Sequence, residues 1–164
     1  MRSTRDPKVE LERWAFDEFA RHARLPIRPG SVESRRPPEP DILCEVEGDG
    51  PVAYELVELI DPLLAENASV AVRKGVPAEA TWVGDPTRER IEAKLLKSYR
   101  AACPVELVAW ASPFITPPDV WQATHAEALR ALAASSQFRR IWVVNLGGPA
   151  DERGVWFVDP PRPT

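Results

Sequence analysis

The chain has few of the residues that build disulfide frameworks and zinc sites. Its 164 residues include two cysteines and two histidines. Cys44 falls in an expected buried strand and Cys103 near the end of an expected helix, so we predict reduced thiols rather than a disulfide. The cysteines and histidines are not spaced as zinc ligands, and we expect no zinc site.

Long apolar stretches are also missing. No run approaches the roughly 18–20 apolar residues of a membrane helix, and the charged residues 1–6 are not followed by the apolar segment of a signal peptide. We therefore expect a cytoplasmic protein with no membrane partner. A hydrophobic content of 44% and six tryptophans, without a low-complexity linker, predict one domain over residues 1–158 and a proline-rich tail at 159–164.

Basic residues are absent from one long stretch. Between Pro37 and Glu66 the sequence has nine acids and no lysine or arginine. A solvated β-face normally mixes both signs of charge. Lysine is scarce throughout, since the whole chain has only Lys8, Lys74, Lys94 and Lys97.

The acidic stretch has the pattern of a β-hairpin. Residues 41–47 and 52–59 are expected to be strands, joined by a three-residue loop at 48–50 that makes Glu45 face Ala53. This register gives one consistently apolar face, made of Ile42, Cys44, Val46, Val52, Tyr54 and Leu56. A two-residue turn at 49–50 is also compatible with the local sequence, but it would scatter the apolar residues over both faces.

Two acids of the hairpin are candidate metal ligands. In the expected register Asp41 and Glu55 form a diagonal pair on the polar face, roughly 6–8 Å apart at the backbone. Mg²⁺ takes oxygen ligands and is usually held by one or two carboxylates with water and phosphate. We predict that Asp41 and Glu55 bind Mg²⁺ or Mn²⁺. The alternative is a half-buried hairpin whose polar face meets water.

The spacing of Pro40-Asp41 and Glu55, within the strand Tyr54–Leu59, resembles the core of the PD-(D/E)xK nuclease superfamily. The resemblance covers the order of elements over about residues 8–146. It implies a restriction-endonuclease-like fold and metal-dependent hydrolysis of phosphodiester bonds in DNA or RNA. The superfamily's lysine, two residues after the glutamate, falls on Val57. This departure leaves open a catalytically inactive relative, acting as a binding or regulatory module, and an interaction protein without a nucleic-acid partner also stays open.

A replacement lysine is expected from the helix after the hairpin. Asp85-Pro86 predicts a helix start, and the helix over 87–102 has one inward stripe of Ile91, Leu95, Tyr99 and Ala102. Lys94 flanks this stripe while Lys97 points further outward. We therefore predict Lys94 as a catalytic residue whose amine lies closer to Glu55 than that of Lys97. An ordinary solvated helix charge is the alternative.

Two further acids complete the candidate site. A first helix, from about residue 6 to 24, places Glu18 on an apolar side near Trp14 and His22. In the resembled fold a first-helix glutamate supports the metal, which makes Glu18 a third candidate metal ligand. A salt bridge to a core-edge arginine, or simple exposure at the rim, is the alternative. Glu58, in the same strand as Glu55, is the second candidate catalytic residue.

The remaining elements complete an α/β fold with a mixed central sheet flanked by helices. We expect a helix over 63–73, buried strands over 105–111 and 140–146, a helix over 117–135 with His125 as a core-edge histidine, and an edge strand over 155–158. The main order is α-β-β-α-β-α-β. The sequence carries no signal for an oligomeric state.

Charge gives only local support for a nucleic-acid partner. The net charge of −4 provides no general basic footprint. Arginines at 21, 24, 28, 35 and 36 precede the acidic hairpin, and basic residues at 88, 90, 94, 97 and 100 follow it. Basic residues on both sides of the hairpin are compatible with a nucleic-acid strand running past a metal site, and equally with a solvated surface.

Overall fold

The structure is a computed structural model that describes residues 6–60, 73–75, 85–114 and 116–159. Its named elements are α1 (Pro7–Ala23), β1 (Glu33–Ser34), β2 (Ile42–Val46), β3 (Gly50–Glu58), α3 (Thr87–Leu95), β4 (Val105–Ala111), α4 (Pro118–Ala134), β5 (Arg140–Asn145) and β6 (Gly154–Val158). The short strand β1 was not expected, whereas β6 is the predicted edge strand over 155–158. Most of the predicted helix over 63–73, and the tail from 160, lie outside the described residues.

The strands form one open mixed sheet of six strands in the order β1-β2-β3-β4-β5-β6. β3, β4 and β5 run parallel, whereas the other neighbours are antiparallel. A parallel strand in the middle of a sheet is covered on both faces and has a continuous apolar sequence. Accordingly, every residue of β4 is buried.

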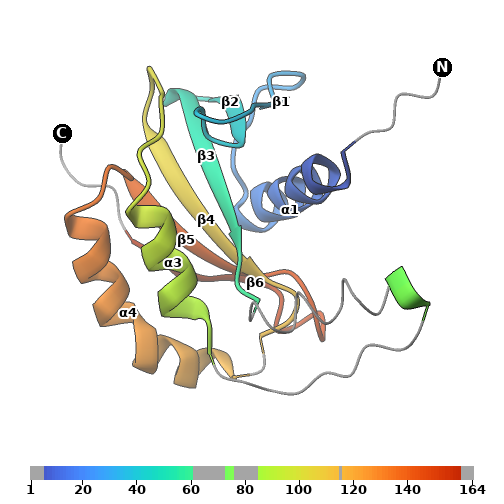
Figure 1. The fold of residues 1–164 in the computed structure, drawn as a ribbon, viewed down its shortest axis with the longest axis vertical. Coiled ribbons are helices and arrows are strands. Elements are labelled where there is room, and N and C mark those ends of the chain that lie inside the picture. The colour runs from blue at the N-terminus through green and yellow to red at the C-terminus, as the bar shows by residue number, and fades with distance from the viewer. Residues whose placement is uncertain (1–5, 61–72, 76–84, 115, 160–164) are drawn as a thin grey trace.

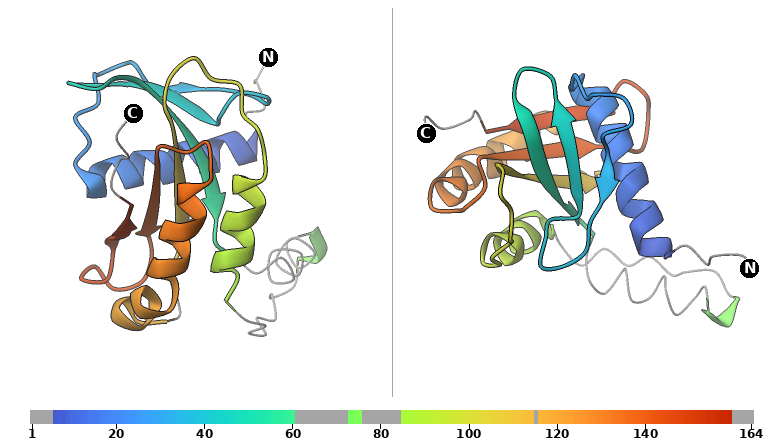
Figure 2. Two further views of the ribbon diagram at one scale, coloured as in Figure 1. Left: turned by 90° about the vertical axis from the view of Figure 1, so that its left-hand side faces the viewer. Right: turned by 90° about the horizontal axis from the view of Figure 1, so that it is seen from above.

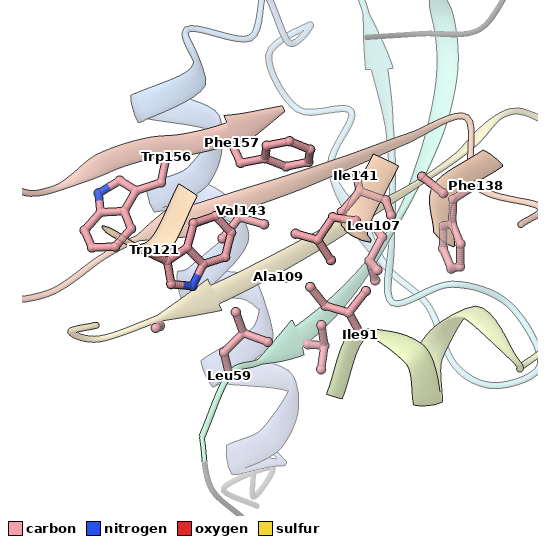
Figure 3. Packing of buried hydrophobic residues seen from close by; sticks show 14 of the residues in the cluster. Leu59, Ile91, Leu107, Ala109, Trp121, Phe138, Ile141, Val143, Trp156 and Phe157 are labelled. Carbon is pink, nitrogen blue, oxygen red and sulfur yellow. The ribbon is translucent and has the colours of Figure 1, made fainter. Parts of the chain in front are cut away.

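Helices cover the two faces of the sheet (Figures 1 and 2). α1 lies against one face, and α3 and α4 lie against the other. Under α1, Phe16 and Phe19 pack on Tyr54 with ring centroids 5.1 and 5.9 Å apart. On the opposite face Trp121 and Ile91 pack among apolar strand residues (Figure 3). The chain is therefore an α/β protein with a separate core on each side of its sheet.

The predicted hairpin is present, but its register differs from the expected one by two residues. Tyr54 pairs with Ile42 and Gly50 with Val46, so the loop is 47–49 and Gly50 already belongs to β3. Gly50 has a φ of 84°, which suits glycine at the start of a strand after a tight turn. The Asp49 carboxylate is held by the Arg139 guanidinium at 2.8 and 2.6 Å, which fixes this loop. A shift of two residues preserves the faces, and the predicted apolar face is confirmed.

The alternative of a hairpin whose polar face meets water does not hold for β3. Tyr54 is 1% exposed and its neighbour Glu55 is 4% exposed. Because β4 pairs along β3 and helices cover both faces, a strand with alternating polarity becomes central. Glu55 is therefore a buried acid that requires a chemical explanation.

α3 is shorter than predicted. It ends at Leu95 rather than near residue 102, because backbone N–H groups beyond it have partners outside the helix. The Arg100 N–H donates to the Pro38 carbonyl at 2.9 Å, and the Tyr99 N–H donates to the Gln137 side chain at 3.4 Å. This extended connection carries Tyr99 back over the hairpin.

The other two helices follow their sequence signals. The Asp6 side chain caps α1 by accepting from the Lys8 N–H at 3.0 Å. In α4, His125 contacts the Asp85 carboxylate at 2.5 Å and packs beside Trp121, so its expected place as a satisfied core-edge histidine is confirmed. Over the described part of the chain, no helix is long and apolar enough to cross a membrane.

Candidate metal and phosphate site

The candidate site lies just before the start of β2, where β3 continues beyond its pairing with that strand. The β2–β3 ladder stops at the Ile42–Tyr54 pair, so Asp41 and Glu55 follow as the next facing residues. They are opposite each other rather than diagonal, as a consequence of the shifted register. Asp41 accepts the Leu56 N–H through Oδ2 at 2.9 Å. This bond satisfies a β3 donor that β2 no longer reaches, and it fixes the aspartate at the strand edge.

Glu55 is the central acid of this site. Its Oε1 contacts the Lys94 ammonium, whereas its buried Oε2 has no hydrogen-bond partner. Burial raises the pKa of Glu55, Asp41 raises it further, and Lys94 opposes the rise. The nearby Tyr99 hydroxyl also acts on this pKa, although neither it nor Oε2 meets hydrogen-bond geometry. One carboxylate oxygen is thus buried beside the Tyr99 hydroxyl without a well-formed hydrogen bond.

Lys94 reaches Glu55 from α3, as predicted. Its side chain is 20% exposed and forms the ion pair with Glu55, while Lys97 lines the same cavity and forms no salt bridge with that acid. Val57 lies on the Glu55 face of β3, is 5% exposed and belongs to the apolar core. The helical lysine therefore places a cation beside Glu55 while position 57 supports packing.

The first helix contributes Glu12, which sequence reasoning missed. Glu12 pairs with Lys8 at 3.2 Å. Burial raises the pKa of Glu12 and nearby Asp41 adds to the rise, while Lys8 and Lys94 oppose it. A sequence signal was present, because Glu12 precedes the buried Phe16 and Phe19 by four and seven residues and so shares their helix face.

Glu18 is not brought to this site, so its predicted placement near the metal is wrong. It forms a salt bridge with Arg21 at 2.6 Å and its side chain is 32% exposed. Arg21 lowers the pKa of Glu18, and this exceeds the opposing effect of desolvation. Because the helix face with Phe16 and Phe19 packs on the sheet, Glu18 points outward. The salt bridge with Arg21 agrees with the alternative given for this residue.

Glu58 lies in a neighbouring cavity. Burial raises the pKa of Glu58 and Arg90 opposes the rise, and Arg90 also donates to the Glu58 carbonyl at 3.1 Å. This cavity of about 180 Å³ includes Glu12, Glu58 and Arg90. A larger one, of about 340 Å³, includes Asp41 and Glu55. Lys8 and Lys94 line both cavities.

The donor set fits a hard divalent cation. Asp41 and Glu55 supply oxygen ligands from adjacent strands, and Glu55 Oε2 is buried without a partner. Among the described residues, no group of three or more histidine, cysteine or acidic side chains is arranged to hold a metal. Mg²⁺ needs no such group, because water and phosphate oxygens complete its coordination.

The raised pKa of Glu55 predicts a stabilising substitution. The folded state takes up a proton on Glu55 more readily than the unfolded state, so the ionised form opposes folding above the ordinary glutamate pKa. Glu55→Gln should therefore raise the free energy of unfolding at pH 7.5, and the gain should vanish as the pH falls below that pKa. Urea unfolding without metal, at pH 7.5 and pH 3.5, measures both values.

Glu18→Gln is the matched control, with the opposite expected sign. Arg21 lowers the pKa of Glu18, so ionised Glu18 favours folding above the folded pKa and loses this effect as the pH falls through it. The exposed pair contributes at most about 1 kcal/mol. A loss of stability in Glu55→Gln at pH 7.5 would show that its bond with Lys94 outweighs its burial.

Comparison of the chain with protein-family models, curated proteins and solved structures found no match. The functional assignment is therefore built from the site alone.

Proposed function

We propose that this protein is a metal-dependent nuclease with a restriction-endonuclease-like fold, hydrolysing phosphodiester bonds in DNA or RNA with Mg²⁺ or Mn²⁺. The observation that carries the proposal is the meeting of Asp41, Glu55 and Lys94 at one strand edge. The three residues come from different elements and are brought together only by the fold. A buried Glu55 with one carboxylate oxygen lacking a hydrogen bond favours a ligand site over a solvated sheet face.

Each residue has a defined part in the proposed reaction. Asp41 and Glu55 would hold the cation, which supplies Lewis-acid stabilisation of the phosphate and lowers the pKa of bound water. Asp41 is kept in place by the Leu56 N–H. Lys94, on α3, brings a positive charge to Glu55, although Val57 stands where the superfamily has its lysine. The Lys94 ammonium can stabilise charge on the phosphate and orient the attacking water.

Glu12, Glu58 and Arg90 belong to the surroundings of the proposed centre. Asp41 raises the pKa of Glu12, and the salt bridge with Lys8 opposes this rise. Glu58 lies on β3 beyond the two metal ligands, and the Arg90 bond to its carbonyl holds the end of the strand. We propose that Glu58 positions this end of the site, while Lys94 is the catalytic side chain.

The proposal predicts a metal-binding loss that can be measured directly. Wild-type protein should bind Mn²⁺ in calorimetry and hydrolyse single-stranded or duplex DNA or RNA with Mg²⁺ or Mn²⁺, and EDTA should stop hydrolysis. An Asp41→Asn, Glu55→Gln double variant should lose at least about tenfold in Mn²⁺ affinity, because it removes both anionic ligands. Glu18→Gln, which changes an acid away from the site, should retain binding and activity.

A non-catalytic relative is the second candidate, favoured by the existing ion pair. Lys94 already neutralises Glu55, so the arrangement can be purely structural. In that case Mn²⁺ binds wild type and the double variant equally, and no nucleic acid is cleaved. Strand binding without hydrolysis would identify a binding module.

A further inference from the structure

A cavity of about 210 Å³ lies beside the candidate site and has no part in the proposed metal chemistry. Its walls come from the hairpin and from the connection that leads into β4. Most of the lining is apolar, namely Pro40, Ile42, Leu43, Pro51, Ala53, Ala101, Ala102 and Cys103. The polar residues around it are Arg35, Glu39 and Arg100. Apolar walls with a few polar groups are typical of a pocket for a small organic group.

One polar atom of this cavity lining lacks a partner. Arg35 uses its terminal nitrogens for Glu33 at 2.8 Å and Glu39 at 3.8 Å, while its Nε is buried without a hydrogen bond. A guanidinium nitrogen can only donate, and leaving a buried donor unsatisfied is costly. A ligand with a hydrogen-bond acceptor would remove this cost.

The cavity lies next to the candidate site, because the two share a lining residue and are joined by backbone hydrogen bonds. Glu39 lines both this cavity and the one that holds Asp41 and Glu55. The Arg35 N–H donates to the Asp41 carbonyl at 2.7 Å, and the Arg100 N–H donates to the Pro38 carbonyl at 2.9 Å. A group bound here would therefore be adjacent to a phosphate at the metal site.

We propose that this cavity holds one nucleobase of the substrate strand, and so selects single-stranded or locally unpaired nucleic acid. The inference rests on the proposed function, which sets the path of the backbone. The apolar walls can cover the faces of a base, the Arg35 guanidinium can donate to a ring nitrogen or carbonyl, and Glu39 can accept from an amino group. A base stacked in a duplex would first have to leave the stack.

Cys103 provides a readout that does not depend on cleavage. It lines the cavity and is partly exposed, whereas Cys44 is 1% exposed. In EDTA at pH 8.5, alkylation of the folded protein by a maleimide should therefore report on Cys103. A short single-stranded DNA of mixed bases, at saturation judged by fluorescence anisotropy, should slow this alkylation about tenfold. An abasic strand of the same length should leave the rate unchanged. Equal protection by both strands, or none by either, overturns the base pocket.

Neighbouring arginines supply a matched pair of variants. Arg35→Ala should weaken binding of the base-containing strand about tenfold or more, because a hydrogen bond to a charged group is lost. Arg36→Ala removes the same charge next to the cavity and should change binding less than about twofold. Because Arg35 also binds two acids and its variant can misfold, Ala102→Phe provides a second test by filling the cavity from an exposed position. Unchanged base-dependent binding in a folded Ala102→Phe protein contradicts the proposal.

The two proposals fail in different ways. Metal-dependent hydrolysis without base-dependent protection of Cys103 overturns the base pocket and leaves the nuclease proposal standing. Base-dependent protection without hydrolysis under any metal condition overturns the nuclease proposal and supports the pocket.

Discussion

Replacing Lys94 with methionine is expected to reduce metal-dependent hydrolysis by about 10²–10³-fold, while Mn²⁺ binding becomes about tenfold tighter. The catalytic loss is the effect of removing one preorganised group that stabilises transition-state charge. The gain in affinity has an electrostatic cause. The Lys94 ammonium contacts Glu55, and its removal frees a carboxylate oxygen and takes away a neighbouring positive charge.

The pH of this experiment matters. Lys94 opposes the rise that burial and Asp41 impose on the pKa of Glu55. Without Lys94 this pKa rises further, and protons compete with the metal at low pH. Calorimetry and cleavage assays are therefore compared at pH 8, where more of the carboxyl is ionised. Affinity for Mn²⁺ in Lys94→Met should then fall more steeply below neutral pH than it does in wild type.

Lys97→Met is the matched control for the lysine prediction. Lys97 lines the same cavity but is not the lysine that contacts Glu55, so its loss should reduce hydrolysis less than about threefold. If Lys94→Met is unstable, a Lys94→Met, Glu55→Gln pair removes both charges together and should recover stability. Full activity in a folded Lys94→Met protein would show that Lys94 only balances a buried acid.

Local patterns predicted the elements better than their long-range relations. Alternation within the hairpin identified its buried face, since a two-residue shift preserves every side-chain direction. The register itself depended on Arg139, far along the chain, which holds Asp49 in the turn. Within 41–59 the glycines Gly48 and Gly50 mark the turn, but the partner of Asp49 lies outside this segment.

The burial of the site was also outside the reach of local reasoning. Glu55 is buried because β4 pairs with β3 and α3 carries Lys94 over it, and both come from later sequence. The wrong acid on α1 was predicted because Trp14, a neighbour of Glu18, was taken as a core residue, whereas it is 43% exposed. If Phe16 and Phe19 are taken as the buried face of the helix, Glu12 lies on that face and is the acid predicted at the site.

Among the substitutions considered, we expect the largest loss of folding stability where a buried ionic network is broken at Glu106. Glu106 is 1% exposed and accepts from the Arg139 Nε at 2.9 Å and from the Trp142 indole at 2.7 Å. Arg139 also binds Asp49, and through it the hairpin turn. The Asp49 hydrogen bonds raise the pKa of Arg139, and Glu106 adds to this rise against desolvation, so the guanidinium stays charged.

Glu106→Ala should lower the free energy of unfolding by about 3–5 kcal/mol, because it leaves the Arg139 Nε–H and the Trp142 indole N–H without the carboxylate that accepts from both. Urea unfolding followed by far-UV circular dichroism measures this loss, with an unchanged denaturant slope if the unfolded state is unaffected. Asp49→Ala is the control, since Asp49 is 42% exposed at its side chain and should cost only about 1 kcal/mol. A loss below about 1 kcal/mol in Glu106→Ala would mean that water or Asp49 replaces the acceptor. Glu106 would then have little part in holding the hairpin against β5.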